Sequence, residues 1–191
     1  MSSSTNRASS RNSRVLYMVE MDMPDASLLS DWHAWYDAHI RILLSVPGFA
    51  SAQRFQSMHA TDSPYVAIYG IASAAIITSA AYREAGGPQS AGPWRLRMTN
   101  WKRNLLEGLD AAPRVAPDGW LAILDRRTQD APPLPAEMST LRPVGLDCSM
   151  VERGLLAGSG GEPPQPRHEA TWELRACRPL TDLLVQRGDA R

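Results

Sequence analysis

One histidine, His39, stands among aromatic and aliphatic residues, where an imidazole could accept a proton from a carbon acid. At about 100° per residue, the segment 26–46 brings an apolar face to one side of a helix. That face consists of Leu28, Trp32, Trp35, Tyr36, His39, Ile42, Leu43 and Val46. A buried imidazole must find hydrogen-bond partners or stay uncharged. Two interpretations are therefore open: a core histidine satisfied by a carbonyl or a tyrosine hydroxyl, or a general base in an aromatic-walled pocket. His33 lies off this face, and we expect it to be exposed to solvent.

Two charged residues stand in apolar strands. Glu20 shares one face of the expected strand 15–21 with Leu16 and Met18. It is either a solvated carboxylate at an edge or open face, or a general base or orienting group inside a barrel. Arg54 alternates with Gln53 in the expected strand 49–55. It could hold a substrate carboxylate or enolate, or form a structural ion pair.

The elements that position these residues follow the order β-α-β-β-α-β, which is the ferredoxin-like order. Pro47 and Gly48 end the first helix and lead into the strand 49–55, because proline disfavours a helical residue before it. A strand at 65–71 forms a hairpin with it, and a second helix covers 74–85. The segment 94–109 mixes aromatic and basic residues, and we expect a lid or a fourth strand there.

The remainder of the chain repeats this pattern imperfectly. Residues 120–125 resemble 16–21, 144–158 resemble 47–60, and 169–176 resemble 65–71. Prolines between 128 and 143 leave no room for the first helix, and the last strand is expected to be missing. The predicted organisation is a disordered tail (1–13), a ferredoxin-like half (14–110), a linker (111–118) and a degenerate second half (119–191).

Composition narrows the classes of function. The 20 basic and 20 acidic residues give a formal net charge of zero, which offers no electrostatic case for nucleic acid or an anionic membrane. The two cysteines and the lack of a long apolar segment or signal peptide favour a reduced, cytoplasmic setting. Nucleotide-binding, metalloprotease and serine-hydrolase motifs are absent, so we expect no metal and no cofactor.

Several motifs resemble the dimeric α+β barrel superfamily, near its EthD-like members. These are WYD at 35–37, the histidine at 39, LLSVPGF at 43–49, YVAIYGI at 65–71, SAAYREA at 79–85 and PWRLRMTNWKRNL at 93–105. WYD stands one residue closer to the histidine than in the pattern of that family. The resemblance implies an α+β fold in which two ferredoxin-like antiparallel sheets pack face to face as a barrel. The second sheet would come from the internal repeat or from a homodimer.

The resemblance also implies chemistry without a cofactor on a small apolar or aromatic molecule, through proton transfer next to a carbonyl. Isomerase, cyclase, lyase or dehydratase, and cofactorless monooxygenase reactions all share this step. The expected catalytic residues are His39 as base, Tyr36 or Arg54 as oxyanion holder, and Glu20. The expected pocket walls are Trp32, Trp35, Tyr17, Tyr69 and Trp101. A non-catalytic binding or accessory protein is the alternative. Haem binding through a histidine is a third reading, disfavoured by the short chain.

Overall fold

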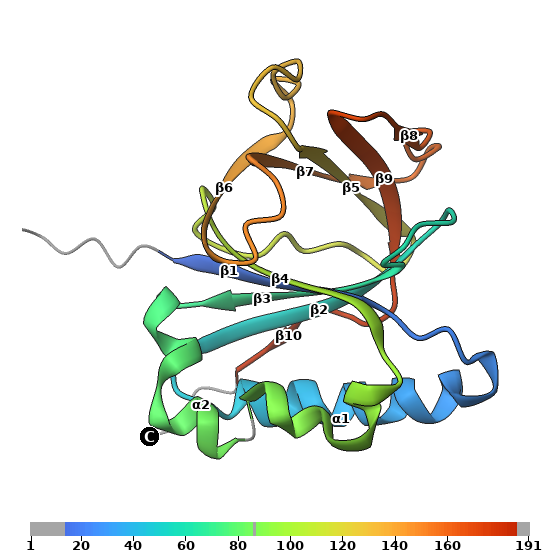
Figure 1. Ribbon diagram of the computed structural model, residues 1–191. Helices are drawn as coiled ribbons and strands as arrows, with labels where there is room; N and C mark the ends of the chain where they lie inside the picture. The colour runs from blue at the N-terminus through green and yellow to red at the C-terminus, as the bar shows by residue number, and fades with distance from the viewer. Residues whose placement is uncertain (1–13, 86, 187–191) are drawn as a thin grey trace, which may run out of the picture.

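The computed structural model describes residues 14–85 and 87–186, with the side chains of 88–90 left out. Its strands form one antiparallel sheet in the order β10-β2-β3-β1-β4-β6-β7-β5-β9-β8, and a further pairing of β2 with β9 closes the sheet into a barrel (Figure 1). The strands are β1 (Val15–Asp22), β2 (Phe49–Ser57), β3 (Tyr65–Ile71), β4 (Thr99–Glu107), β5 (Gly119–Arg126), β6 (Ser139–Leu146), β7 (Glu152–Ser159), β8 (Arg167–His168), β9 (Trp172–Pro179) and β10 (Leu184–Val185). The prediction of disorder for 1–13 falls outside the described residues.

The helices of the described chain lie together against one outer side of the barrel, below β1, β2 and β3 in Figure 1. They are η1 (Ala26–Leu28), α1 (Leu29–Leu44), η2 (Ala74–Thr78), α2 (Ala80–Glu84) and η3 (Gly87–Leu96). The Asp25 side chain accepts a hydrogen bond from the Ser27 backbone N–H at 3.1 Å and so begins this region. α1 ends at Leu44, ahead of Pro47 and of Gly48 with its φ of 95°. None of the described helices combines the length and apolarity that crossing a membrane requires.

The second part of the chain repeats the strand order of the first. β2-β3-β1-β4 and β6-β7-β5-β9 have the same arrangement, and the two halves meet through equivalent pairings, β4 with β6 and β9 with β2. The prediction that the repeat lacks its last strand is therefore wrong. The segment 169–176, expected to match 65–71, belongs mainly to β9, which takes the place of β4. The true match of 65–71 is β7, because pairing partners rather than local sequence similarity decide the place of each strand.

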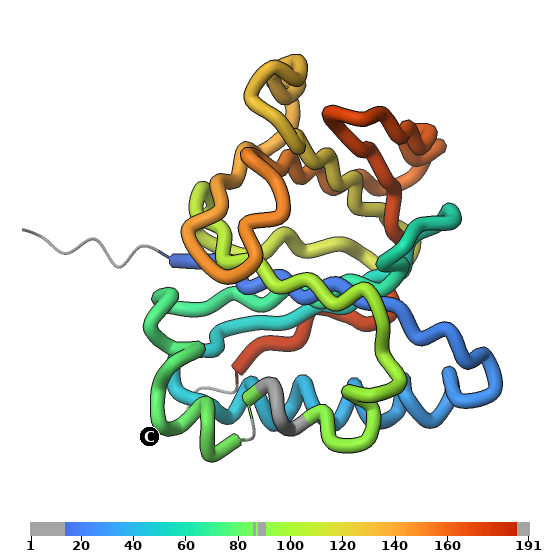
Figure 2. The backbone as a smooth tube through the Cα atoms, in the orientation of Figure 1, coloured from blue at the N-terminus to red at the C-terminus, as the bar shows by residue number. Residues whose placement is uncertain are grey.

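The missing helix of the repeat was predicted correctly, since no helix occurs between β5 and β6 in this fully described part of the chain. A loop that rises above the barrel in Figure 2 takes its place. Its residues Leu134 and Met138 pack on the outer face of β5, β7 and β9. Pro143 lies within β6 where the register with β4 shifts, which is a position that tolerates the lost N–H.

The sheet separates two apolar cores. Along β1, Tyr17, Val19 and Met21 face α1, whereas Leu16 and Met18 face the barrel interior. The alternation predicted for this strand is therefore confirmed. In β2 a register shift after Phe49 moves that ring to the helix side, away from Phe55 in the barrel. The two faces provide two separate places where chemistry could occur.

Candidate functional site

A small cavity, here called the aromatic pocket, lies between α1 and the outer face of the sheet. It measures about 30 Å³, which is enough for one water-sized molecule, so a larger ligand requires its walls to move apart. Its lining includes Tyr17 from β1, Tyr36 and His39 from α1, Tyr69 from β3 and Trp101 from β4. With Trp35, which also lines the pocket, the structure therefore brings six of the sequence-predicted site residues together.

α1 places His39 against two aromatic rings of its own preceding turn. The imidazole stacks on Trp35, with ring centroids 5.1 Å apart and planes at 12°, and meets the edge of Tyr36 at 5.9 Å. These are the i+4 and i+3 neighbours that a helix brings together. Burial lowers the pKa of His39 to about 4. The ring is therefore neutral at pH 7 and retains a nitrogen lone pair.

The phenols of the pocket remain protonated and act as hydrogen-bond donors. Burial raises the pKa of Tyr17 and of Tyr69 well above the usual value, and the Tyr17 hydroxyl lies 3.5 Å from that of Tyr82. The Tyr69 hydroxyl and the Trp101 indole N–H are buried without a hydrogen-bond partner among the described residues. The Tyr36 phenol contributes to the high pKa of Tyr69, but the geometry of a hydrogen bond is not met. Buried donors of this kind favour contact with an acceptor oxygen.

Arg54 lies outside the pocket, below the ring of Tyr36. It is 3% exposed, pairs with the Asp37 carboxylate at 2.8 Å, and places its guanidinium carbon 4.2 Å from the Tyr36 ring centroid. The guanidinium already pairs with the Asp37 carboxylate, so Arg54 forms a structural ion pair, which is the second of the two roles expected for it. Arg54 makes a cation–π contact with the Tyr36 ring and does not line the pocket where a ligand would bind.

The environment of Arg54 also corrects the expectation for His33. The His33 Nδ1 atom lies 2.9 Å from the Arg54 guanidinium, and its ring packs against Trp32 and Tyr65 at 4.9 and 5.4 Å. His33 is therefore half-buried rather than solvated, because its ring contacts Arg54 and the two aromatic rings. Trp32 is fully buried in this cluster and does not line the aromatic pocket.

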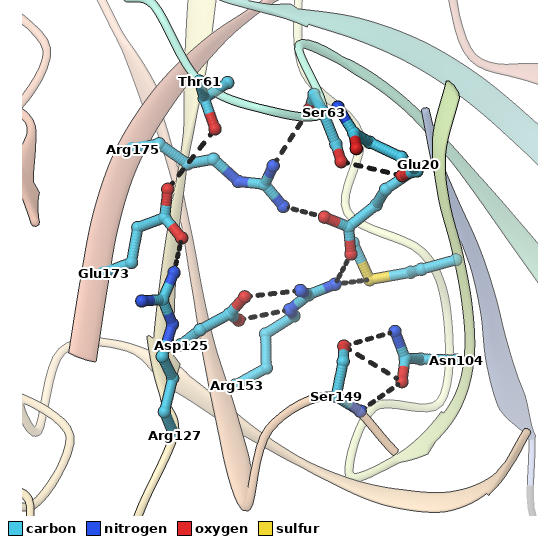
Figure 3. Close-up of polar contacts among 12 residues, drawn as sticks. Glu20, Thr61, Ser63, Asn104, Asp125, Arg127, Ser149, Arg153, Glu173 and Arg175 are labelled. Carbon is cyan, nitrogen blue, oxygen red and sulfur yellow. Dashed lines mark hydrogen bonds and ion pairs between the residues drawn. The ribbon is translucent and has the colours of Figure 1, made fainter. Parts of the chain in front are cut away.

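Glu20 lies on the opposite face of the sheet, inside the barrel, where it is 1% exposed (Figure 3). It pairs with Arg153 of β7 at 2.6 Å and with Arg175 of β9. Burial opposes its ionisation, but the two guanidinium groups outweigh that effect and lower its pKa to about 2. Glu20 is therefore in the predicted barrel interior but is neither solvated nor placed to act with His39.

The sequence interpretation missed Tyr82 and Met98, which complete the pocket wall from α2 and from the segment before β4. The apolar face of α1 could not reveal them, because they come from separate segments. Arg153 and Arg175 were also missed, although an arginine within an apolar strand is the same signal that drew attention to Glu20.

Comparison with known proteins finds likeness in structure alone. No family model matches the chain, and no curated protein matches it. One similar structure is a putative monooxygenase from Lactobacillus acidophilus, with a TM-score of 0.55, 8% identity, and coverage of 91% of this chain and 97% of that one. Another is an anthrone oxidase-like protein, with a TM-score of 0.53, 9% identity, and coverage of 92% and 93%. The shared architecture is an α+β fold whose antiparallel sheet closes into a barrel.

Proposed function

We propose that the protein is a monooxygenase-type enzyme that needs no cofactor and acts on a small aromatic or apolar ketone in the aromatic pocket. The observation that carries the proposal is the coexistence in one pocket of a neutral, half-buried His39 with two buried donors, Tyr69 and Trp101, that have no hydrogen-bond partner among the described residues. A base and oxyanion donors in an apolar setting are what enolisation requires. The names of the two structural neighbours favour oxygenation over the isomerase, cyclase and lyase reactions.

The reaction begins when His39 removes a proton from the carbon next to the substrate carbonyl. The oxyanion of the resulting enolate accepts hydrogen bonds from the Tyr69 hydroxyl and the Trp101 N–H. The negative charge of the enolate raises the pKa of the adjacent His39 imidazolium, which offsets the low pKa that His39 has when no substrate is bound. The electron-rich carbon then reduces O₂: one oxygen atom becomes the new carbonyl of the product and the other leaves as water.

The proposal includes a family assignment: two ferredoxin-like halves in a protein related to the EthD-like members of the dimeric α+β barrel superfamily. The order β2-β3-β1-β4 with α1 and α2 on one face supports a ferredoxin-like half, and the equivalent order β6-β7-β5-β9 supports a second. The WYD-His-PGF motif supports EthD-like membership. One chain then supplies both sheets of the barrel.

Oxygen uptake with anthrone as the probe substrate tests the function. The wild-type protein should consume O₂ and form the quinone, and kcat/KM should fall only as the pH approaches 4, because the free enzyme's His39 titrates there. The variant His39→Leu should lose about two to four orders of magnitude in turnover while its Tm holds or rises.

The matched control is His168→Leu, which removes an exposed imidazole far from the pocket and should leave the rate unchanged. A full rate in His39→Leu would contradict the role of the base. Anthrone that quenches tryptophan fluorescence without any oxygen uptake would instead support a binding protein and contradict the enzyme.

A further inference from the structure

A second and larger cavity opens at the end of the barrel that carries the β2–β3 turn and β8, on the right of Figure 1. It measures about 370 Å³, which lies within the range of small-molecule sites. Its lining is polar and includes Glu20, Lys102 and Arg175. Because Glu20 faces the barrel interior, the sheet separates this barrel-mouth cavity from the aromatic pocket.

The buried carboxylates of the barrel-mouth cavity are already occupied. Each Glu20 oxygen accepts a bond from one arginine, Arg153 or Arg175. Both Asp125 oxygens accept from Arg153 at 2.6 Å, as Figure 3 shows. The Glu173 oxygens accept from Arg127 and from the Thr61 hydroxyl. A cationic ligand would find none of these charges free.

Free donors remain in the lining, although its basic side chains balance its carboxylates in number, and Arg153 outside the lining adds one further positive charge beside Glu20. The printed sequence contains a single lysine, Lys102, among its 20 lysine and arginine residues. In the β1–β4 ladder Lys102 stands directly opposite Glu20, so both side chains project from the same face of the sheet. Glu20 forms its ion pairs with the two arginines, and Lys102 forms no ion pair with any described carboxylate. Arg175 uses its bonds to Glu20 and to the Ser63 carbonyl, which leaves further N–H groups of its five.

We propose that the barrel-mouth cavity binds a small organic carboxylate, with Lys102 as its main partner and Arg175 as the second. The other titratable groups of the lining are His59, His168, Arg167 and Asp62. Arg167 adds positive charge at the exposed rim, and Asp62 is an exposed carboxylate of the lining that pairs with no basic side chain among the described residues. A lysine suits a site that must accept anions of different shape, because its ammonium is a compact charge without a fixed fork.

The single lysine makes a direct experiment available. Reductive methylation of the full chain with ¹³C-formaldehyde labels Lys102 and the N-terminal amine while keeping the charge. Titration with sodium succinate should shift the Lys102 signal to saturation and leave the N-terminal signal in place. Sodium chloride at matched ionic strength is the reference. A Lys102 signal that does not move, or that moves equally with chloride, would overturn the proposal.

Calorimetric titration with succinate then assigns the contact. Lys102→Met should weaken binding at least tenfold, whereas Arg142→Met should change it less than twofold, because Arg142 is 76% exposed and outside the lining. Unchanged affinity in Lys102→Met would overturn the assignment. The variant His39→Leu should bind succinate normally, so the failure of either proposed site is distinguishable from the failure of the other.

Discussion

At the scale of residues, His39 on α1 and Glu20 on β1 have lowered pKa values for different reasons. Burial disfavours the charged form of His39, and its pKa falls to about 4. Glu20 is buried as well, yet two guanidinium groups stabilise its charged form and its pKa falls to about 2. The first is a neutral base above pH 4, and the second is a permanent anion that joins strands.

The low pKa of His39 predicts a pH dependence of stability. Its folded-state pKa lies below the usual value of about 6.5, so the unfolded chain binds the proton more readily. The contribution is fully present above pH 6.5 and is lost as the pH falls to 4. We expect the free energy of unfolding of the wild type to drop by roughly 2 kcal/mol more than that of His39→Leu between pH 7 and pH 4, allowing for partial exposure. Urea titrations at both pH values measure it, and parallel pH profiles would contradict it.

At the scale of elements, the turn between α1 and β2 brings Gly48 into contact with η2. Gly48 has a φ of 95°, and a Cβ added there would lie 2.2 Å from the Ile76 Cδ1 atom of η2. Only glycine fits this turn without strain, and η2 packs directly against the turn through Ile76.

Gly48→Ala should destabilise the protein by about 2–3 kcal/mol, since the strain of the positive φ adds to the displacement of the half-buried Ile76 side chain. Gly160→Ala is the matched control, because Gly160 also has a positive φ of 66° but nothing within 4 Å of the added Cβ. We expect about 1 kcal/mol there from the backbone alone. Thermal unfolding of the two variants makes the comparison, and equal losses would show that the Ile76 contact does not matter.

At the scale of the whole molecule, the two halves are joined by strand pairing and by a buried ionic cluster. Glu20 lies in β1, whereas Arg153 and Arg175 lie in β7 and β9 of the other half. The barrel interior also combines Leu16 and Phe55 of the first half with apolar residues of the second. Stability is therefore shared between the halves.

Glu20→Gln should lower the free energy of unfolding by about 3–5 kcal/mol, because it leaves two buried guanidinium groups without their shared carboxylate. Glu162→Gln, an exposed change in the loop before β8, should cost less than 0.5 kcal/mol. Guanidinium or urea unfolding distinguishes them. A cost for Glu20→Gln as small as that of the control would show that the cluster adds no net stability.

The second half should not fold by itself. In a fragment of residues 119–191, β6 would lose its partner β4, β9 would lose β2, and the inner faces of Leu121 and Leu155 would be bare. We expect no cooperative thermal transition and a poorly dispersed amide spectrum. A dispersed, cooperative fragment would contradict this dependence of one half on the other.

The sequence by itself determined the elements whose signals are local. Most of the apolar face of α1, the Pro47-Gly48 stop and the alternation in β1 are set by residues close together in the chain, so periodicity revealed them. The prediction for that face was wrong at Ile42, which is 48% exposed, and it missed the buried Ile40 and Leu44. His39 among its aromatic neighbours followed from the same helix period. The tertiary structure decided what depends on partners far along the chain. β9 became the fourth strand of the repeat because β5 offered an edge, Arg54 pairs with Asp37 of α1, and Glu20 pairs with arginines more than 130 residues away. Long-range pairing has no period in sequence, which is why only the folded chain shows it.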